Sequence, residues 1–351
     1  MWLENKVFNE DLRNISKCES VDWQKLNGAN VLITGATGLI GFTTLSAVLF
    51  STQDFEVPPT VFALVRNVER AKEKLGPVMD EYGDRLQLVV GDVASPLELN
   101  ERIDYIVHGA SPTASKYFIE HPVETIATAF LGTKNMLEVA YKNQVKGFVY
   151  LSSMEAYGKG KEGWISEDYA GDVNQLQVRS SYPEGKRASE CLCMCYMSEY
   201  NVPVKIARLA QTFGAGVDDR DLRACAEFAR CAVESKDIIF KTTGQSRRMY
   251  LYTADAATAI LCMLLNDKAE GAFNVANEET LASVVETAEA AVASVEGSKS
   301  KIILPESDTP DAAKYPAQHN LQLDTSKLRD LGWKPSYNLV EMFRRMIDSW
   351  S

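Results

Sequence analysis

The sequence predicts an α/β fold in which a doubly wound parallel sheet is followed by a smaller C-terminal α/β domain. Short apolar segments alternate with helix-length segments through the first two hundred residues, which is typical of a parallel sheet covered by helices on both faces. A glycine-rich turn follows the first apolar segment. The length of 351 residues suits two domains, since one domain takes roughly 100–200 residues.

Six segments are expected to be strands because they are short, rich in Val, Ile and Leu, and almost continuously apolar, like strands buried on both faces. These segments are residues 31–34, 61–65, 86–90, 105–108, 148–151 and 204–208. Residues 40–50, 122–142 and 182–200 are long enough for helices. After about Thr212 the alternation weakens, beginning with a stretch rich in Gly and Asp at 214–221.

The charge balance argues against a nucleic-acid partner. The chain has 37 Lys and Arg against 48 Asp and Glu, a net charge of −11, and such a surface repels polyphosphates at long range. Residues 1–28 mix acidic and basic side chains without an apolar run, so we expect neither a secretory signal nor a transit peptide. No stretch reaches the roughly 18 apolar residues of a membrane helix, so no membrane partner is expected.

The seven cysteines are an odd number that fits a reducing, cytoplasmic location better than a disulfide framework. Cys191, Cys193 and Cys195 look like a metal cluster, but residues two apart on a helix point to different faces. Only three histidines are present to complete a site. We therefore expect these cysteines to be small buried residues, and we expect no metal site.

Three glycines, Gly35, Gly38 and Gly41, stand at three-residue spacing where the first strand turns into a helix. Glycine lets the backbone turn sharply and approach a pyrophosphate held at the helix N-terminus. The position after the first strand of a βα series favours this interpretation over an incidental turn. We therefore predict a Rossmann-type dinucleotide site, and its first turn consists of Gly35, Thr37, Gly38, Leu39, Ile40 and Gly41.

The ends of the next strands supply further cofactor candidates. The second strand ends in Arg66, without the acidic residue that binds a ribose 2′-hydroxyl, and an arginine can instead accept a 2′-phosphate. NAD is the expected cofactor and NADP the alternative, although Arg66 can equally be a solvated residue. Asp92 can bind the adenine amino group or cap the following segment. Val93, Ala110 and Ser111 complete the expected cofactor contacts.

Tyr182 and Lys186 place a phenol and an ammonium four residues apart, on one face of a helix. A nearby cation lowers the pKa of tyrosine from about 10, which favours a role as a base. Such pairs are common by chance, but the fifth predicted strand ends with Ser152, Ser153 and Glu155. Because ligands of open α/β sheets bind at the carboxyl ends of the strands, these groups are expected to converge there.

Several motifs together give the chain a family resemblance. Thr-Gly-x-x-Gly-x-x-Gly stands at 34–41, Ser-Ser-x-x-x-Tyr-Gly at 152–158 and Tyr-x-x-x-Lys at 182–186. The further matches are Gly132-Thr133 with Asn135, Arg208 with Phe213-Gly214, Arg248 before Tyr252 and Asp255, Asn274 with Asn277, and Gly332-Trp333 with Pro335. From about Ala29 to Trp350 the chain resembles extended short-chain dehydrogenases/reductases of the NAD-dependent nucleotide-sugar epimerase/dehydratase family.

The resemblance implies a cofactor that stays bound and acts as a redox catalyst within one turnover. Tyr182 would take the proton from a sugar hydroxyl, usually at C4, Ser153 would hydrogen-bond the same oxygen, and Lys186 would hold the cofactor ribose. The expected substrate contacts are Ser111, Ser153, Gln211 and Arg248; Arg248 is the candidate for the diphosphate because guanidinium matches phosphate geometry. The implied partner is a nucleoside diphosphate sugar, with a UDP-sugar first, and relatives usually form homodimers through two long helices, here 122–142 and 182–200.

Glu155 discriminates among the reactions of the resembled family. Its 4-epimerases often have a small residue there, whereas 4,6-dehydratases and uronate decarboxylases have a glutamate for acid/base work. Dehydratases commonly add an Asp before it, where this chain has Met154. We rank a UDP-glucuronate decarboxylase slightly above a 4,6-dehydratase and both above a UDP-hexose 4-epimerase. A solvated Glu155, an NADPH-dependent carbonyl reductase and a non-catalytic dinucleotide sensor remain as alternatives.

Departures from the family pattern fall mainly on the substrate side. Gln211 and Ala129 each stand where an asparagine is usual, Gly185 replaces a serine, and the arginine of a late Arg-Pro-Asp-like segment is missing at 315–319. For the domains we expect an N-terminal extension at 1–28 and a dinucleotide-binding domain at 29–207, to which about 249–270 returns. The substrate-binding domain would then consist of 208–248 and 271–351.

Overall fold

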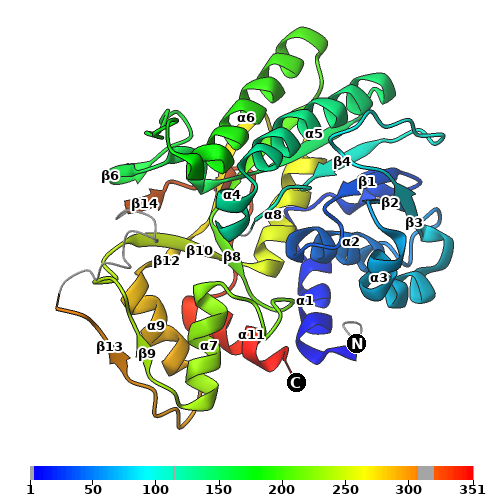
Figure 1. The fold of residues 1–351 in the computed structure, drawn as a ribbon. Helices are drawn as coiled ribbons and strands as arrows, with labels where there is room; N and C mark the ends of the chain where they lie inside the picture. The colour runs from blue at the N-terminus through cyan, green and yellow to red at the C-terminus, as the bar shows by residue number, and fades with distance from the viewer. Residues whose placement is uncertain (1–3, 114, 307–319, 351) are drawn as a thin grey trace.

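The structure is a computed structural model, and it describes residues 4–113, 115–306 and 320–350. Its main layer is a seven-stranded sheet in the order β11-β7-β5-β4-β1-β2-β3 (Figure 1), and every adjacent pair is parallel. The strands are β1 (Asn30–Thr34), β2 (Thr60–Val65), β3 (Leu86–Val90), β4 (Tyr105–His108), β5 (Gly147–Ser153), β7 (Val204–Leu209) and β11 (Gly271–Val275). All six predicted strands belong to this sheet, which confirms the predicted fold class.

Helices cover both faces of the sheet. On one face are α2 (Leu39–Ser51), α3 (Val68–Tyr82) and α8 (Thr253–Leu265), and on the other are α5 (Pro122–Asn143) and α6 (Ser181–Tyr200), which lie side by side (Figure 1). Val31 and Ile33 pack into the core under α2, whereas Leu32 packs into the core under α5 and α6. Burial on both faces explains why the strands are almost continuously apolar.

A second sheet has the strand order β12-β10-β14-β6, with β8 paired to β10. Its strands are β6 (Gly160–Ile165), β8 (Gln211–Phe213), β10 (Arg247–Tyr252), β12 (Asn277–Ser283) and β14 (Asn320–Leu323). Strands β9 (Ile238–Ile239) and β13 (Ile302–Ile303) form a separate pair. The remaining helices are α4 (Ser115–Glu120), α7 (Ala224–Glu234), α9 (Val284–Ala293), α10 (Ser326–Arg329) and α11 (Leu339–Asp348), and short 3₁₀ turns include η4 (Met154–Tyr157) and η5 (Val178–Ser180).

Two strands pair across the expected domain limits. Strand β6 lies within 29–207 but pairs with β14 of the second sheet. Strand β11 lies within 271–351 but pairs with β7 at the edge of the main sheet. Both pairings join segments far apart in sequence, so local patterns carry no information about them.

Residues expected only as an N-terminal extension form helix α1 (Lys6–Ser16), which packs against α2 and α8. Phe8 stacks on Phe42 of α2 with ring centroids 5.5 Å apart. The carboxylate of Asp11 is buried and accepts hydrogen bonds from the Tyr252 hydroxyl and the Arg345 guanidinium, both at 2.7 Å. The first helix is therefore part of the core.

Two buried acids beside α1 predict a pH-dependent stability. Burial raises the pKa of Asp255 to about 7 and that of Asp11 to about 6. Because the folded-state pKa lies above the unfolded value, the native state binds extra protons, and stability falls as the pH rises from about 4 through about 7. We expect Asp255→Asn to remove part of this fall, because the amide does not titrate. When the pH rises from 5 to 8, the free energy of unfolding should fall by about 2 kcal/mol less in the variant than in the wild type.

Urea unfolding of both proteins at pH 5, 6, 7 and 8 tests this expectation. Asp84→Asn, at an exposed site in the turn after α3, is the control and should follow the wild type at each pH. A difference between Asp255→Asn and wild type that stays constant across this range would contradict the prediction.

Candidate active site

The turn after β1 accepts only glycine at two of its positions. Gly35 has φ +72°, and a Cβ there would lie 2.8 Å from the carbonyl carbon and oxygen of Gly109. A Cβ on Gly41 would lie 2.2 Å from the carbonyl oxygen of Gly35. Gly38 is the N-cap of α2 and offers no side-chain cap, so the first amides of the helix remain available to an anion.

A buried histidine holds β1 and β4 together at the point where the strand order reverses. The hydroxyl of Thr34 lies 2.8 Å from Nδ1 of His108 and accepts hydrogen bonds from the amides of Gly109 and Ala110, both at 3.1 Å. Thr133 on α5 lies 3.3 Å from the other ring nitrogen. Burial lowers the pKa of His108 to about 3, so the neutral ring is a structural link that the sequence did not reveal.

Ala110, Ser111 and Val93 were predicted to contact the cofactor, and the structure gives each a distinct environment. Ala110 is half-buried, and the hydroxyl of Ser111 is buried without a hydrogen-bond partner among the described residues. Val93 is buried against α5, where a Cβ on Gly132 would lie 2.9 Å from its side chain. An orphaned hydroxyl and a turn that excludes side chains are features that fit a bound dinucleotide.

The two candidates at the ends of β2 and β3 are both exposed. Arg66 makes no hydrogen bond or ion pair with the part of the chain that the structure describes, and it stands directly after β2. Asp92 accepts a hydrogen bond from the amide of Ala94 at 2.9 Å, which is the local capping alternative. That contact uses one carboxylate oxygen and leaves the other for a ligand.

Tyr182 and Lys186 lie next to the end of β5 in the structure. Lys186 is buried, donates to the carbonyl oxygen of Leu151 at 2.7 Å, and its Nζ lies 5.7 Å from the ring centre of Tyr182. Ser153 lies at the end of β5, where its hydroxyl accepts from the amide of Glu155 at 3.2 Å. The Ser153 hydroxyl is close enough to the Tyr182 phenol to act against the rise in its pKa.

The expected low pKa of Tyr182 is not found in the protein alone. Burial raises the pKa of the phenol above the usual tyrosine range and the charge of Glu155 raises it further, whereas the Ser153 hydrogen bond and Arg179 oppose the shift. Burial also lowers the pKa of Lys186 to about 8, opposed by the charge of Glu190. The expectation was wrong because it counted the cation and omitted the desolvation of the phenol.

Glu155 is not the solvated carboxylate of the alternative interpretation. It is half-buried on η4, and its Oε2 accepts a hydrogen bond from Arg179 at 2.8 Å. The Arg179 guanidinium also lies 5.1 Å from the ring centre of Phe118, and this ring stacks on Tyr182 with centroids 4.3 Å apart. Arg179 and Phe118 therefore contact residues of the candidate site, and the sequence analysis missed both.

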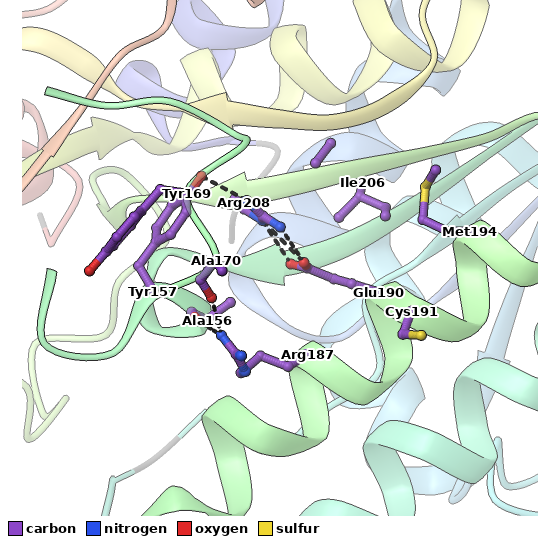
Figure 2. Close-up of a pocket in the computed structure, with 11 residues that line it drawn as sticks. Ala156, Tyr157, Tyr169, Ala170, Arg187, Glu190, Cys191, Met194, Ile206 and Arg208 are labelled. Carbon is purple, nitrogen blue, oxygen red and sulfur yellow. Dashed lines mark hydrogen bonds and ion pairs between the residues drawn. The ribbon is translucent and has the colours of Figure 1, made fainter. Parts of the chain in front are cut away.

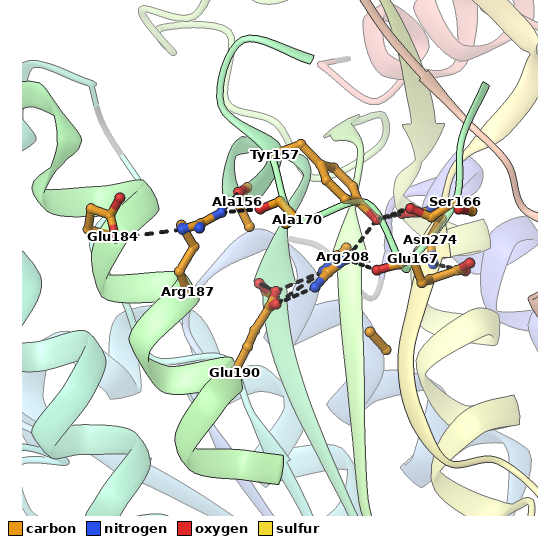
Figure 3. A network of polar contacts seen from close by, with 12 residues as sticks. Ala156, Tyr157, Ser166, Glu167, Ala170, Glu184, Arg187, Glu190, Arg208 and Asn274 are labelled. Atoms are coloured by element: carbon orange, nitrogen blue, oxygen red, sulfur yellow. Dashed lines mark hydrogen bonds and ion pairs between the residues drawn. The ribbon is translucent and has the colours of Figure 1, made fainter. Parts of the chain in front are cut away.

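A buried ion pair connects α6 to the main sheet (Figure 3). Glu190, one turn after Lys186, accepts bonds of 2.7 to 3.1 Å from Arg208 and one of 2.5 Å from Ser152. Arg208 also donates to the Tyr157 hydroxyl at 2.8 Å, and that hydroxyl donates to Asn274 at 2.7 Å. These bonds fix α6, and with it the Tyr182–Lys186 pair, against β5 and β7.

A pocket of about 280 Å³ opens beside this network, between α6, η4 and β7 (Figure 2). Arg187, Glu190 and Arg208 line it, and Figure 2 shows Glu190 and Arg208 turned toward each other. Arg187 donates to the carbonyl oxygens of Ala156 and Ala170. Since its charged groups already bind one another or the backbone, and none of Ser153, Glu155, Tyr182 and Lys186 lines it, this pocket is distinct from the predicted catalytic cluster.

Gln211 and Arg248 meet on the paired strands β8 and β10. An Nη1 of Arg248 donates to the Gln211 side chain at 3.4 Å, and its Nε is buried without a partner among the described residues. A half-buried guanidinium with a buried, unused donor suits a phosphate or carboxylate ligand. The predicted departure at 315–319 lies outside the described residues.

The cysteines of α6 differ from the expectation of buried side chains. Cys193 is buried, but Cys191 and Cys195 are exposed, because the helix turns them away from the sheet. No group of three or more His, Cys, Asp and Glu suited to a metal occurs in residues 4–113, 115–306 and 320–350. Within the same ranges, no helix is long and apolar enough to cross a membrane.

The fold and the side chains gathered at the carboxyl edge of its sheet define a dinucleotide-binding α/β protein with a serine, tyrosine and lysine constellation. The family model described as the NAD dependent epimerase/dehydratase family matches residues 31–276. The chain belongs to this family.

Similar proteins agree with this assignment. UDP-glucuronic acid decarboxylase 1 of Danio rerio is 29% identical over 322 residues, covering 92% of this chain and 72% of the relative. UDP-glucuronic acid decarboxylase 6 of Arabidopsis thaliana is also 29% identical, over 89% of this chain and 85% of the relative.

Solved structures share the fold at low sequence identity. The dTDP-glucose 4,6-dehydratase of Streptomyces venezuelae, with NAD bound, has a TM-score of 0.73 and 21% identity over 92% of this chain and 96% of its own. The UDP-glucuronic acid 4-epimerase of Bacillus cereus, bound to UDP-glucuronic acid and NAD, has a TM-score of 0.71 and 19% identity over 91% and 98%.

Proposed function

We propose that this chain is a NAD-dependent enzyme that oxidises a UDP-sugar at C4 and decarboxylates UDP-glucuronate. The observation that carries the proposal is the meeting of Ser153, Tyr182 and Lys186 at the sheet edge, with the Glu155–Arg179 ion pair beside Tyr182. The names of the relatives, UDP-glucuronic acid decarboxylases, support the same reaction.

The residues of the cluster take distinct parts in this chemistry. The glycine turn after β1 would hold NAD, which would supply a hydride acceptor and later donor for C4 and, in its oxidised form, a positive charge. Tyr182 takes the proton of the C4 hydroxyl, Ser153 hydrogen-bonds that oxygen, and Lys186 holds the ribose and the local positive charge. The 4-ketone then accepts the electron pair of the C5–C6 bond as carbon dioxide leaves, and C5 gains a proton. Glu155 is placed to guide that proton.

Decarboxylation fits the neighbourhood of Glu155 better than dehydration does. Dehydration needs a proton donor for the departing C6 hydroxyl, and the adjacent side chain is Met154, which is buried and apolar. Decarboxylation needs no such donor because the leaving group is carbon dioxide. A cation next to Glu155 also suits a substrate with a carboxylate at C6.

Mass spectrometry after incubation with UDP-glucuronate, UDP-glucose, UDP-N-acetylglucosamine and dTDP-glucose tests the proposal. We expect UDP-glucuronate to lose carbon dioxide without net change in reduced-nicotinamide absorbance. Loss of water from a hexose would indicate a dehydratase, and an isomer of unchanged mass an epimerase. Steady consumption of NADPH with an external ketone, or no turnover of any sugar, would overturn the proposal.

The cofactor is proposed to be NAD, in agreement with the description of the family. The exposed Arg66 at the end of β2 leaves NADP as the alternative. The mass of the dinucleotide released from the denatured protein, measured by mass spectrometry, decides between them, because NADP carries one additional phosphate.

We propose that the protein forms a homodimer through α5 and α6. The exposed surface of these helices carries large apolar side chains, among them Val123 (70% exposed), Phe130 (38%), Tyr141 (47%) and Met194 (40%). Apolar side chains gathered on one face of a protein are typical of interaction surfaces. A second copy of the chain would cover them by pairing the same two helices.

Phe130→Lys is expected to weaken this dimer at least about tenfold, because a charge would be buried against an apolar surface. Sedimentation should give about twice the chain mass of 38.9 kDa for the wild type and a mass close to one chain for the variant at low micromolar concentration. Ile239→Lys, which places the same charge at an exposed position of β9, should remain dimeric. A monomeric wild type would refute the proposed dimer.

A further inference from the structure

Arg179 has a defined place at the edge of the catalytic cluster. It lies in η5, three residues before Tyr182. Its Nη2 donates to Oε2 of Glu155 at 2.8 Å, and its guanidinium lies 5.1 Å from the Phe118 ring centre. The same ring stacks on Tyr182 with centroids 4.3 Å apart and an interplanar angle of 7°. One carboxylate and one aromatic ring therefore orient the guanidinium beside the expected base.

The guanidinium retains unused hydrogen-bonding capacity. Arginine has five N–H donors, and the bond to Glu155 is the one that Arg179 makes with side chains of the described residues. Its side chain keeps 28% of its surface exposed. Pre-orientation on an aromatic ring combined with free donors suits paired hydrogen bonds to a second carboxylate.

The charges around Arg179 suit a substrate with a carboxylate better than a neutral sugar. Glu155 carries a negative charge close enough to the Tyr182 hydroxyl to raise its pKa, and Arg179 opposes that shift. A substrate carboxylate that enters beside Glu155 meets a like charge, which is unfavourable in a partly buried site. Arg179 offsets this repulsion by binding both carboxylates.

Arg248 and Arg179 belong to separate clusters, so one substrate can use both. Arg248 lies on β10 with Gln211, and its buried Nε is unused among the described residues. Arg179 lies at the start of α6 with Glu155. A nucleoside diphosphate uronate has two anionic parts, the diphosphate and the C6 carboxylate, and two such guanidinium sites match them.

We propose that Arg179 is the receptor for the C6 carboxylate of the substrate and makes the site selective for uronates over neutral hexoses. This inference rests on the proposed function and adds to it the residue that recognises the substrate class. When the C5–C6 bond breaks, the electron pair passes to the C4 ketone and the carboxylate leaves as neutral carbon dioxide. The product no longer carries the group that the guanidinium binds, so Arg179 does not retain it.

Calorimetric titration of the cofactor-loaded protein with UDP-glucuronate and UDP-xylose tests this role, and every variant is made in a Tyr182→Phe background so that UDP-glucuronate is not decarboxylated during the titration. The two ligands differ only in the C6 carboxylate, so UDP-xylose reports on every other contact. Arg179→Gln is expected to weaken UDP-glucuronate binding about 10- to 100-fold and to change UDP-xylose binding less than about twofold. Arg179→Lys should give an intermediate loss, because it keeps the charge without the paired geometry.

Arg102→Gln is the matched control, because Arg102 is exposed and precedes β4, at the opposite edge of the sheet. Its titrations should equal those of the Tyr182→Phe parent, and circular dichroism should show each variant folded. Equal losses for both ligands would mean that Arg179 has only a structural role, and no loss would mean that it does not contact the carboxylate; either result overturns the inference. Failure of the proposed function is separate, since the wild type itself would then release no carbon dioxide from UDP-glucuronate.

Discussion

Replacing Tyr182 by phenylalanine is expected to lower turnover of UDP-glucuronate by about 10²- to 10⁴-fold, the usual contribution of a positioned general base. The substitution removes one oxygen and leaves the ring, which stacks on Phe118 at 4.3 Å. Packing of the buried side chain should therefore persist. Carbon dioxide release measures the loss, and calorimetric titration with UDP-xylose should show binding close to that of the wild type.

A matched control shows whether the expected loss is specific to the hydroxyl of Tyr182 or follows the removal of a hydroxyl from another tyrosine. Tyr82 ends α3 and is half-buried beside Arg85. Helix α3 lies on the side of the molecule away from α6 (Figure 1). Tyr82→Phe should retain turnover within about twofold. A Tyr182→Phe protein with turnover within threefold of wild type would show that another group takes the proton, and the proposed mechanism would be wrong.

Replacing Gly41 by alanine is expected to cost the protein about 3 kcal/mol or more of unfolding free energy, together with its bound cofactor. The new Cβ would lie 2.2 Å from the carbonyl oxygen of Gly35 and 3.1 Å from the Cα of Ala36. Both atoms belong to the backbone, so the first turn of α2 has to move away from β1. That movement displaces the amides expected to face the pyrophosphate.

Urea unfolding and the amount of dinucleotide released from the purified protein measure these two effects. Gly76→Ala is the control, because a Cβ there meets nothing within 4 Å. Alanine favours the helix, whereas the following Pro77 disfavours a side chain before it, so stability should stay within about 1 kcal/mol of wild type. A Gly41→Ala protein that keeps its full complement of cofactor would contradict the assigned turn.

The sequence was most informative where one local requirement decides the residue type. Gly35 and Gly41 were found because only glycine fits their positions. Tyr182 and Lys186 were found because helical spacing places them on one face. The six strands were found because each is buried on both faces and is therefore apolar throughout.

Residues whose partners are distant in the chain were missed. Arg179 pairs with Glu155, 24 positions earlier, and a single arginine in a polar loop gives no signal of that contact. In the sequence, His108 is only the last residue of an apolar strand, but in the structure its ring lies between Thr34 of β1 and Thr133 of α5. Glu190 reads as an ordinary helical carboxylate, although it is buried against Arg208.

By itself, the sequence determined the parallel sheet, the glycine turn and the helical pairing of Tyr182 with Lys186, because local sterics and side-chain periodicity specify them. The role expected for Ser153 came from the family resemblance. The tertiary structure alone decided the surroundings of those groups. It paired β6 and β11 with distant strands, packed α1 into the core, and placed Arg179 against Glu155. It also showed that the pKa of Tyr182 is raised and not lowered. Desolvation causes this shift, and it depends on every element that packs around the phenol and not on the neighbouring lysine alone.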